Sequence, residues 1–173
     1  MSSLSPEHRS LLMRANRLLG ASLVEANLVK IENLEAANER LLELISTGNY
    51  RKGSVLSILA YELQVVKEGD VLQYAVDEQG AGLVDLRSYD IPEDLRATTD
   101  LGACWATWSV PFDREEDVYF IATAYYLSPA VRSYWEKQLG APVVWYGTTL
   151  EMLTDHFEKT EAARAGTPSA TTK

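Results

Sequence analysis

The sequence predicts an α+β fold in which a duplicated helix-corner-helix layer, residues 18–82, precedes a small α+β subdomain, residues 83–161. In the first part, apolar side chains recur at the spacing of helices that bury one face. After Gly82 the period changes, and β-rich segments alternate with capped helices, which indicates about three main strands with helices on one face of the sheet. An N-terminal helical extension, residues 1–17, and a disordered Ala/Gly/Pro/Ser/Thr-rich tail, residues 162–173, flank these parts.

The N-terminal region is expected to contain two consecutive helices. Ser5 is a suitable N-cap and Pro6 a suitable first helical residue, which predicts a short helix over residues 6–16. A second helix is expected over residues 18–26. It should end at Asn27, because asparagine tolerates the left-handed conformation that terminates helices.

The same organisation then returns along the chain. A helix is expected from Ile31 until the chain turns at Gly48, followed by a helix over residues 54–63, a corner at Gln64 and a further helix to Gln79. Aligning the two corners indicates an internal duplication. The alignment places Gln64 on Asn27, Leu28-Val29 on Val65-Val66, and Leu34 on either Val71 or Leu72.

The second half reads as strands punctuated by helices. A short strand is expected at residues 83–86 and one helical turn at Pro92, followed by a hairpin of residues 104–112 and 118–126. A helix capped by Ser128 and stopped by Gly140, a strand over residues 142–146, and a last helix capped by Thr148 or Thr149 complete the order.

Charge and composition exclude several classes of protein. The net charge is −9 and the 16 Lys and Arg are scattered, so a phosphate backbone would be repelled. The helix after the first corner presents Glu32, Glu35 and Glu39, which argues against a DNA-reading helix-turn-helix. No apolar run approaches the roughly 18 residues of a membrane span. The single cysteine, Cys104, lies in an apolar run, which is typical of a buried, reduced thiol in a cytoplasmic protein.

Catalytic and metal sites are not expected. His8 and His156 have no carboxylate or cysteine at ligand spacing, and both are assigned structural or surface roles. The acidic residues Asp113, Glu115, Glu116 and Asp117 are interpreted as a solvated hairpin turn rather than as a cation loop. No serine, cysteine or aspartate stands in a motif with a base.

Three segments of the sequence resemble the N-terminal domain of type II secretion and type IV pilus assembly ATPases. The repeat "LGASLVEANLVKIENLEAA" follows that family's order of Leu-Gly and Leu-Val pairs before a corner, and the segments from "VDEQ" to "YDIPEDL" and from "VPFDREED" to "EKQLG" follow its second half. The resemblance runs from Leu18 to Phe157. It implies a docking or regulatory domain that binds the cytoplasmic part of an inner-membrane platform protein. No phosphate loop is present, so the resemblance does not extend to the ATPase.

One subset of that family binds cyclic di-GMP through two copies of the repeat. There an arginine precedes Leu-Gly in each copy, whereas here the positions hold Leu18 and Val55, and Arg17 is one residue out of register. Cyclic di-GMP binding is therefore the alternative interpretation, and no other cofactor is expected. Its candidate residues are Arg17, Leu19, Gly20, Leu23 and Gln79.

The aromatic residues concentrate after residue 100, more than one small core needs. On a sheet covered on one side, alternate aromatics would face outward and could bind a protein partner; ordinary core packing is the other interpretation. The partner-binding candidates are Trp105, Trp108, Tyr125 and Trp145.

The preferred hypothesis is a non-catalytic module that docks on a component of a secretion, pilus or envelope-polysaccharide machine, recruited to the inner membrane by its partner. An uncharacterised enzyme is the third hypothesis.

Overall fold

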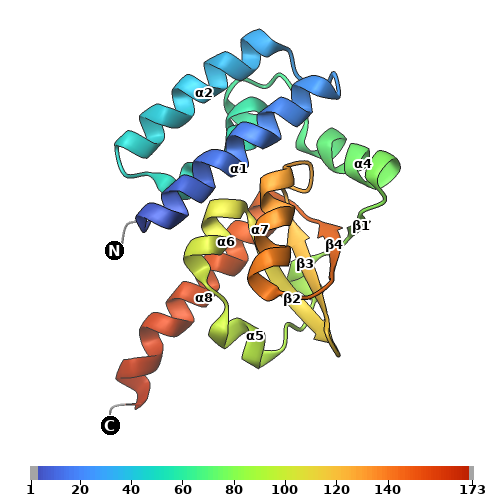
Figure 1. Cartoon of the computed structure of the whole chain (residues 1–173). Helices are drawn as coiled ribbons and strands as arrows, with labels where there is room; N and C mark the ends of the chain where they lie inside the picture. The colour runs from blue at the N-terminus through green and yellow to red at the C-terminus, as the bar shows by residue number, and fades with distance from the viewer. Residues whose placement is uncertain (1–3, 172–173) are drawn as a thin grey trace.

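The computed structural model describes residues 4–171, apart from the side chains of Lys52 and residues 167–171. The fold is α+β, as predicted, with the N-terminal helices stacked on one end of a four-stranded sheet (Figure 1). Within the described residues, no helix is both long and apolar enough to cross a membrane. The elements in order are α1 (Pro6–Glu25), α2 (Ile31–Ser46), η1 (Tyr50–Lys52), α3 (Val55–Ser57), η2 (Ile58–Glu62), α4 (Glu68–Gln79), β1 (Gly82–Leu83), η3 (Leu86–Ser88), α5 (Glu93–Thr98), α6 (Leu101–Thr107), β2 (Ser109–Glu115), β3 (Val118–Thr123), α7 (Pro129–Leu139), β4 (Val143–Gly147) and α8 (Leu150–Thr171).

The first helix, α1, is continuous, so the predicted division into helices over residues 6–16 and 18–26 is wrong. Its start is as predicted, because the Ser5 side chain accepts a hydrogen bond from the His8 amide at 3.1 Å. The Asn16 side chain lies inside this helix, where asparagine often competes for local backbone groups. Here it donates to the Leu12 carbonyl of the preceding turn at 2.9 Å, and the helix continues.

Both predicted corners are confirmed by the backbone. Asn27 has φ of 62° and Gln64 has φ of 56°, the left-handed region that asparagine tolerates and glutamine rarely adopts. The following helices, α2 and α4, begin after Lys30 and Lys67, which lie at the same distance from their corners. The predicted end of α2 is also confirmed.

Before the corner, the second copy of the repeat is one residue longer than the first. In the second copy the helix ends in a π turn, η2, in which the Leu63 amide donates to the Ile58 carbonyl at 2.8 Å. Beyond the corner the two copies align without a gap, and the corresponding residues Leu34 and Val71 are both buried. Leu34 therefore aligns with Val71 rather than with Leu72.

The strand order in the sheet is β1-β4-β3-β2. β2 and β3 form the predicted antiparallel hairpin, and β4 pairs in parallel with both β3 and β1. The pairing of β2 shifts between Pro111 and Asp113, which marks a bulge at Phe112. Figure 1 shows α7 lying across one face of this sheet.

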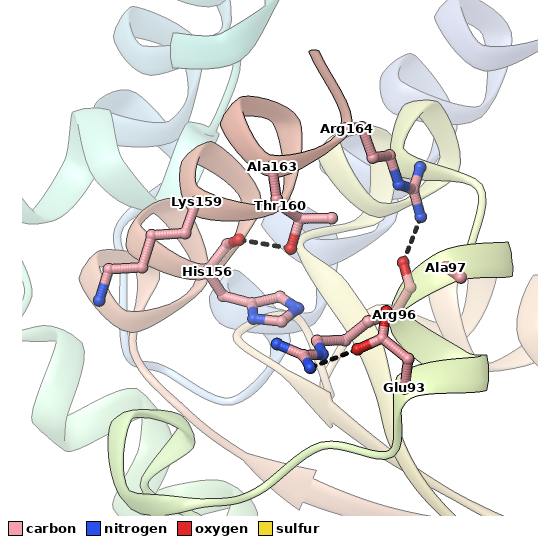
Figure 2. Close-up of a pocket in the computed structure, with 8 residues that line it drawn as sticks. All are labelled: Glu93, Arg96, Ala97, His156, Lys159, Thr160, Ala163 and Arg164. Carbon is pink, nitrogen blue, oxygen red and sulfur yellow. Dashed lines mark hydrogen bonds and ion pairs between the residues drawn. The ribbon is translucent and has the colours of Figure 1, made fainter. Parts of the chain in front are cut away.

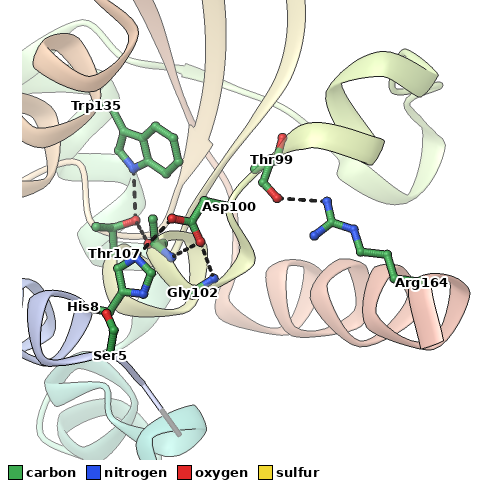
Figure 3. Close-up of polar contacts among 9 residues, drawn as sticks. Ser5, His8, Thr99, Asp100, Gly102, Thr107, Trp135 and Arg164 are labelled. Carbon is green, nitrogen blue, oxygen red and sulfur yellow. Dashed lines mark hydrogen bonds and ion pairs between the residues drawn. The ribbon is translucent and has the colours of Figure 1, made fainter. Parts of the chain in front are cut away.

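The first hairpin strand begins later than predicted, because residues 101–107 form helix α6. Asp100 caps this helix through the amides of Gly102 and Ala103 and also contacts His8 Nε2 at 3.1 Å (Figure 3). Trp108, with φ of 49°, ends the helix and turns the chain into β2. The expected strand over residues 104–112 is therefore wrong up to Trp108. Cys104 lies inside α6 and is fully buried, as expected.

The last helix, α8, extends well beyond the predicted boundary. The expectation of a disordered tail from residue 162 is wrong as far as Thr171, while residues 172–173 lie outside the described part of the chain. Arg164 holds this segment by donating to the carbonyl oxygens of Arg96 at 2.6 Å and Thr99 at 2.9 Å. Composition alone suggested disorder because this tertiary contact is not visible in it.

A buried polar network joins the helical layer to the sheet subdomain. The side-chain oxygen of Asn16 accepts hydrogen bonds from the Val55 amide at 2.8 Å and from the Tyr125 hydroxyl at 2.6 Å. Its amide group also donates to the Gly53 carbonyl at 3.2 Å, and Ser54 shares a hydrogen bond with Tyr125. The two predicted parts thus share one core.

We expect Asn16→Ala to lower the free energy of unfolding by about 3 kcal/mol, because it leaves several buried groups without their partner. Urea denaturation followed by circular dichroism measures this. The matched control is Asn49→Ala, since Asn49 is exposed and should change stability by less than about 0.5 kcal/mol. Equal losses in the two variants would contradict a central role for Asn16.

Candidate docking face

The four aromatic residues predicted to bind a partner are buried, so the expectation that they are exposed is wrong. Trp105, Trp108 and Trp145 are 2%, 4% and 9% exposed, and Tyr125 is fully buried. Trp105 packs against Phe157 of α8, with ring centroids 4.8 Å apart. Its predicted strand is a helix, so the alternation that would have placed it outward does not apply.

The outward-facing rings lie instead on the opposite face of the sheet from Trp145. Because side chains alternate along a strand, Val144 and Tyr146 point away from Trp145. Val144 pairs with Phe120 on β3, and the bulge brings Phe112 to the same face. We call this surface the ring face; it consists of Tyr89, Phe112, Phe120, Val144 and Tyr146.

The rings of this face form one connected cluster around Phe112. The centroid of Phe112 lies 4.9 Å from that of Tyr89 and 5.4 Å from that of Tyr146, both edge-to-face. Phe112 is buried, whereas Tyr89 is 38% and Val144 is 42% exposed. A hollow of about 440 Å³ lies over the cluster, so an apolar side chain from outside can contact several rings at once.

The rim of the hollow is mainly acidic. Asp113 and Glu115 line it together with Arg114, and Arg114 forms an ion pair with Asp94 of α5 at 3.0 Å. Asp113 accepts a hydrogen bond from the Tyr89 hydroxyl, which raises the pKa of Tyr89 to about 12. Glu115, Glu116 and Asp117 are exposed in the hairpin turn, as expected. In the described part of the chain, no three potential ligands are grouped to hold a metal ion.

The residues predicted for dinucleotide binding are not brought together. Leu19, Gly20 and Leu23 are buried between helices, and a Cβ on Gly20 would lie 2.5 Å from Cδ1 of Leu34. Arg17 is exposed on α1. Gln79 lies at the end of α4 beside the last turn of α1, in a hollow of about 230 Å³ that the other four residues do not line.

The tandem corners and the mixed sheet define a fold class with solved members. One is the N-terminal domain of XpsE in crystal form I4122, which is 20% identical with a TM-score of 0.53 and covers 91% of this chain and 98% of that chain. A second crystal form of the XpsE domain is 18% identical with a TM-score of 0.55, over 84% and 94% of the two chains. MshE with cdg is 18% identical with a TM-score of 0.52, over 82% and 97%.

These matches confirm the predicted resemblance at the level of the fold: the chain has the fold of the N-terminal domain of secretion and pilus ATPases. No protein-family model matches the chain, and no curated protein matches it by sequence. The matched structures are covered over almost their whole length, so the fold is shared as a whole.

We expect Asp113→Asn to lower the pKa of Tyr89 from about 12 toward the ordinary value of about 10, because the phenol loses its charged acceptor. The titration of Tyr89 is obtained as the difference in alkaline absorbance between each protein and its Tyr89→Phe version. Asp117→Asn, which changes an exposed carboxylate of the same turn, should leave the difference curve unaltered. An unchanged curve for Asp113→Asn would disprove the contact.

Proposed function

We propose that the chain is a non-catalytic docking module that uses its ring face to bind a protein component of a secretion, pilus or envelope-polysaccharide machine. The observation that carries this proposal is a connected aromatic cluster on a sheet face, in which Tyr89, Phe120 and Tyr146 are partly exposed around the buried Phe112. Partly exposed rings around a hollow are typical of protein interfaces, where aromatic anchors supply most of the binding energy.

The charge around the ring face indicates the chemistry of the partner. Glu115 is exposed at its rim, Glu116 and Asp117 are exposed in the adjoining hairpin turn, and the whole chain carries a net charge of −9. A partner segment with apolar side chains next to lysine or arginine is complementary to this arrangement. We propose the cytoplasmic part of an inner-membrane platform protein as that partner, which would place the module in the cytoplasm, at the inner membrane.

The fold similarity to the XpsE domain and to MshE supports a docking or regulatory role and, at identities of 18–20%, goes no further than the fold. Fold similarity does not identify a binding surface, and the ring face supplies a specific candidate for one. A catalytic function is not part of the proposal, because no side chain of this face is arranged as a nucleophile with a base.

Val144→Lys should weaken binding to the purified cytoplasmic region of the platform protein about tenfold or more, since it places a charge on the ring face next to Phe120 of the neighbouring strand and repels a basic segment. Biolayer interferometry measures the affinity. Leu42→Lys is the matched control, because Leu42 is also an exposed apolar residue, 55% exposed, but lies on α2. Equal affinities for the two variants would refute the ring face as the docking surface.

Cyclic di-GMP binding is a second candidate, favoured by the similarity to MshE with cdg and by the position of Gln79 beside α1. Against it, Leu18 precedes Leu-Gly in the first copy, and its counterpart in the second copy, Ser54 once the extra residue of η2 is counted, is fully buried. We therefore expect calorimetric titration of the folded protein with micromolar cyclic di-GMP to give no saturable heat. A saturable signal abolished by Gln79→Ala would favour the receptor function instead.

A further inference from the structure

A cavity of about 530 Å³ separates α5 from α8, away from the ring hollow (Figure 2). Its wall is partly apolar, formed by Ala97 and Ala163, and its size falls in the range of small-molecule sites. The polar lining residues are Glu93, Arg96, His156, Lys159, Thr160 and Arg164. The two helices that form the cavity are far apart in the sequence, and neither the docking proposal nor the dinucleotide alternative uses it.

The charge of this cavity is opposite to that of the protein. Three side chains, Arg96, Lys159 and Arg164, are cations, and a single lining carboxylate, Glu93, forms an ion pair with Arg96 at 2.5 Å. One ion pair therefore leaves two cationic groups in excess in a chain whose net charge is −9. Concave walls of one sign concentrate ions of the other sign.

Arg164 is held with one donor directed away from its structural contacts. Its terminal nitrogen donates to the carbonyl oxygens of Arg96 and Thr99, which fixes the guanidinium against the end of α5. Its Nε atom is buried and has no hydrogen-bond partner among the described residues. Because Nε is shielded from solvent, the donor left for an anion in the cavity is the second terminal nitrogen, which makes no hydrogen bond to the described residues.

His156 lies at the centre of the same wall, and Figure 2 shows its ring next to the side chain of Arg96. Burial lowers the pKa of His156, and the charges of Arg96, Arg164 and Lys159 lower it further. Glu93 is the one carboxylate facing the cavity from α5, and it is paired with Arg96. An anion at this wall would offset the repulsion from three cations and favour the protonated imidazole.

We propose that this cavity binds the phosphate group of a small phosphorylated molecule, with the apolar part of that molecule against Ala97 and Ala163. A phosphate dianion suits a wall of several cations from two helices better than a single carboxylate does. The guanidinium of Arg164 contacts the phosphate oxygens, and the ammonium of Lys159, which Figure 2 shows on the other side of His156, attracts the anion at longer range. His156 donates to the phosphate when it is protonated.

The two histidines of the chain allow a direct test by NMR. The C2 protons of His156 and His8 are titrated against pH, assigned with His156→Gln, in the presence of chloride, phenyl phosphate or benzoate at equal ionic strength. Phenyl phosphate should raise the pKa of His156 by about one unit and leave the resonance of the His8 C2 proton unshifted at every pH. No shift, or an equal shift with benzoate, would overturn the proposal.

Variants locate the ligand in the cavity. Lys159→Gln changes an exposed side chain and should preserve the fold while reducing the phenyl phosphate affinity about fivefold. Arg87→Gln is the control, because Arg87 is an exposed cation on η3, outside the cavity. Binding of the phosphate dianion, corrected for the ligand's own protonation at about pH 6, should also be tighter at pH 6 than at pH 7.5, since proton and dianion binding to the cavity favour each other. Equal affinity in Lys159→Gln and Arg87→Gln would place any bound phosphate elsewhere.

Discussion

The side chain of Asn16 determines how the helical layer meets the sheet. Its two amide hydrogens go to the carbonyl oxygens of Leu12 and Gly53, and its oxygen accepts from the Val55 amide and the Tyr125 hydroxyl. All the hydrogen-bonding capacity of the group is used inside the core, which removes the usual cost of burying it. Because these partners come from three separate segments, the geometry of one amide fixes their mutual positions.

The open ring face follows from this constraint. Tyr125 lies two residues after the end of β3, and Ser128, the residue before α7, donates to the Ala15 carbonyl of α1 at 2.8 Å. These contacts hold α7 against one face of the sheet, where Glu136 of α7 accepts from the Trp145 indole at 3.4 Å. With α7 placed there, the rings on the opposite face are not covered by α7, which leaves them for the proposed docking.

The sequence predicted those features that local chemistry decides. The corners at Asn27 and Gln64 and the hairpin follow from periodicity and from the residues that end helices. The exposure of the aromatic residues could not be predicted, because it depends on which side chains of a strand alternate toward which face. Residues 104–107 form a helix instead of a strand, and the bulge at Phe112 shifts the alternation, so each changes which side chains face outward. An aromatic surplus was visible in the composition, but only the structure separates the buried Trp145 from the exposed side of β4. The cationic cavity joins residues of α5 and α8, a juxtaposition that no spacing along the chain reveals.

Helix α5 borders both proposed sites, so the contacts that hold it in place decide whether the two sites influence each other. On the side of the ring face, Asp94 pairs with Arg114 of β2; on the side of the cavity, the carbonyls of Arg96 and Thr99 are held by Arg164 of α8. A ligand in the cavity can change the affinity for a protein partner only if α5 has more than one placement and the ligand and the partner bind these placements with different affinities. Contacts within the chain fix α5 from both sides, and the phosphate site uses donors of Arg164 other than those bound to the carbonyls. We therefore expect the two sites to act independently, with the cavity adding a ligand to the docking module rather than a switch.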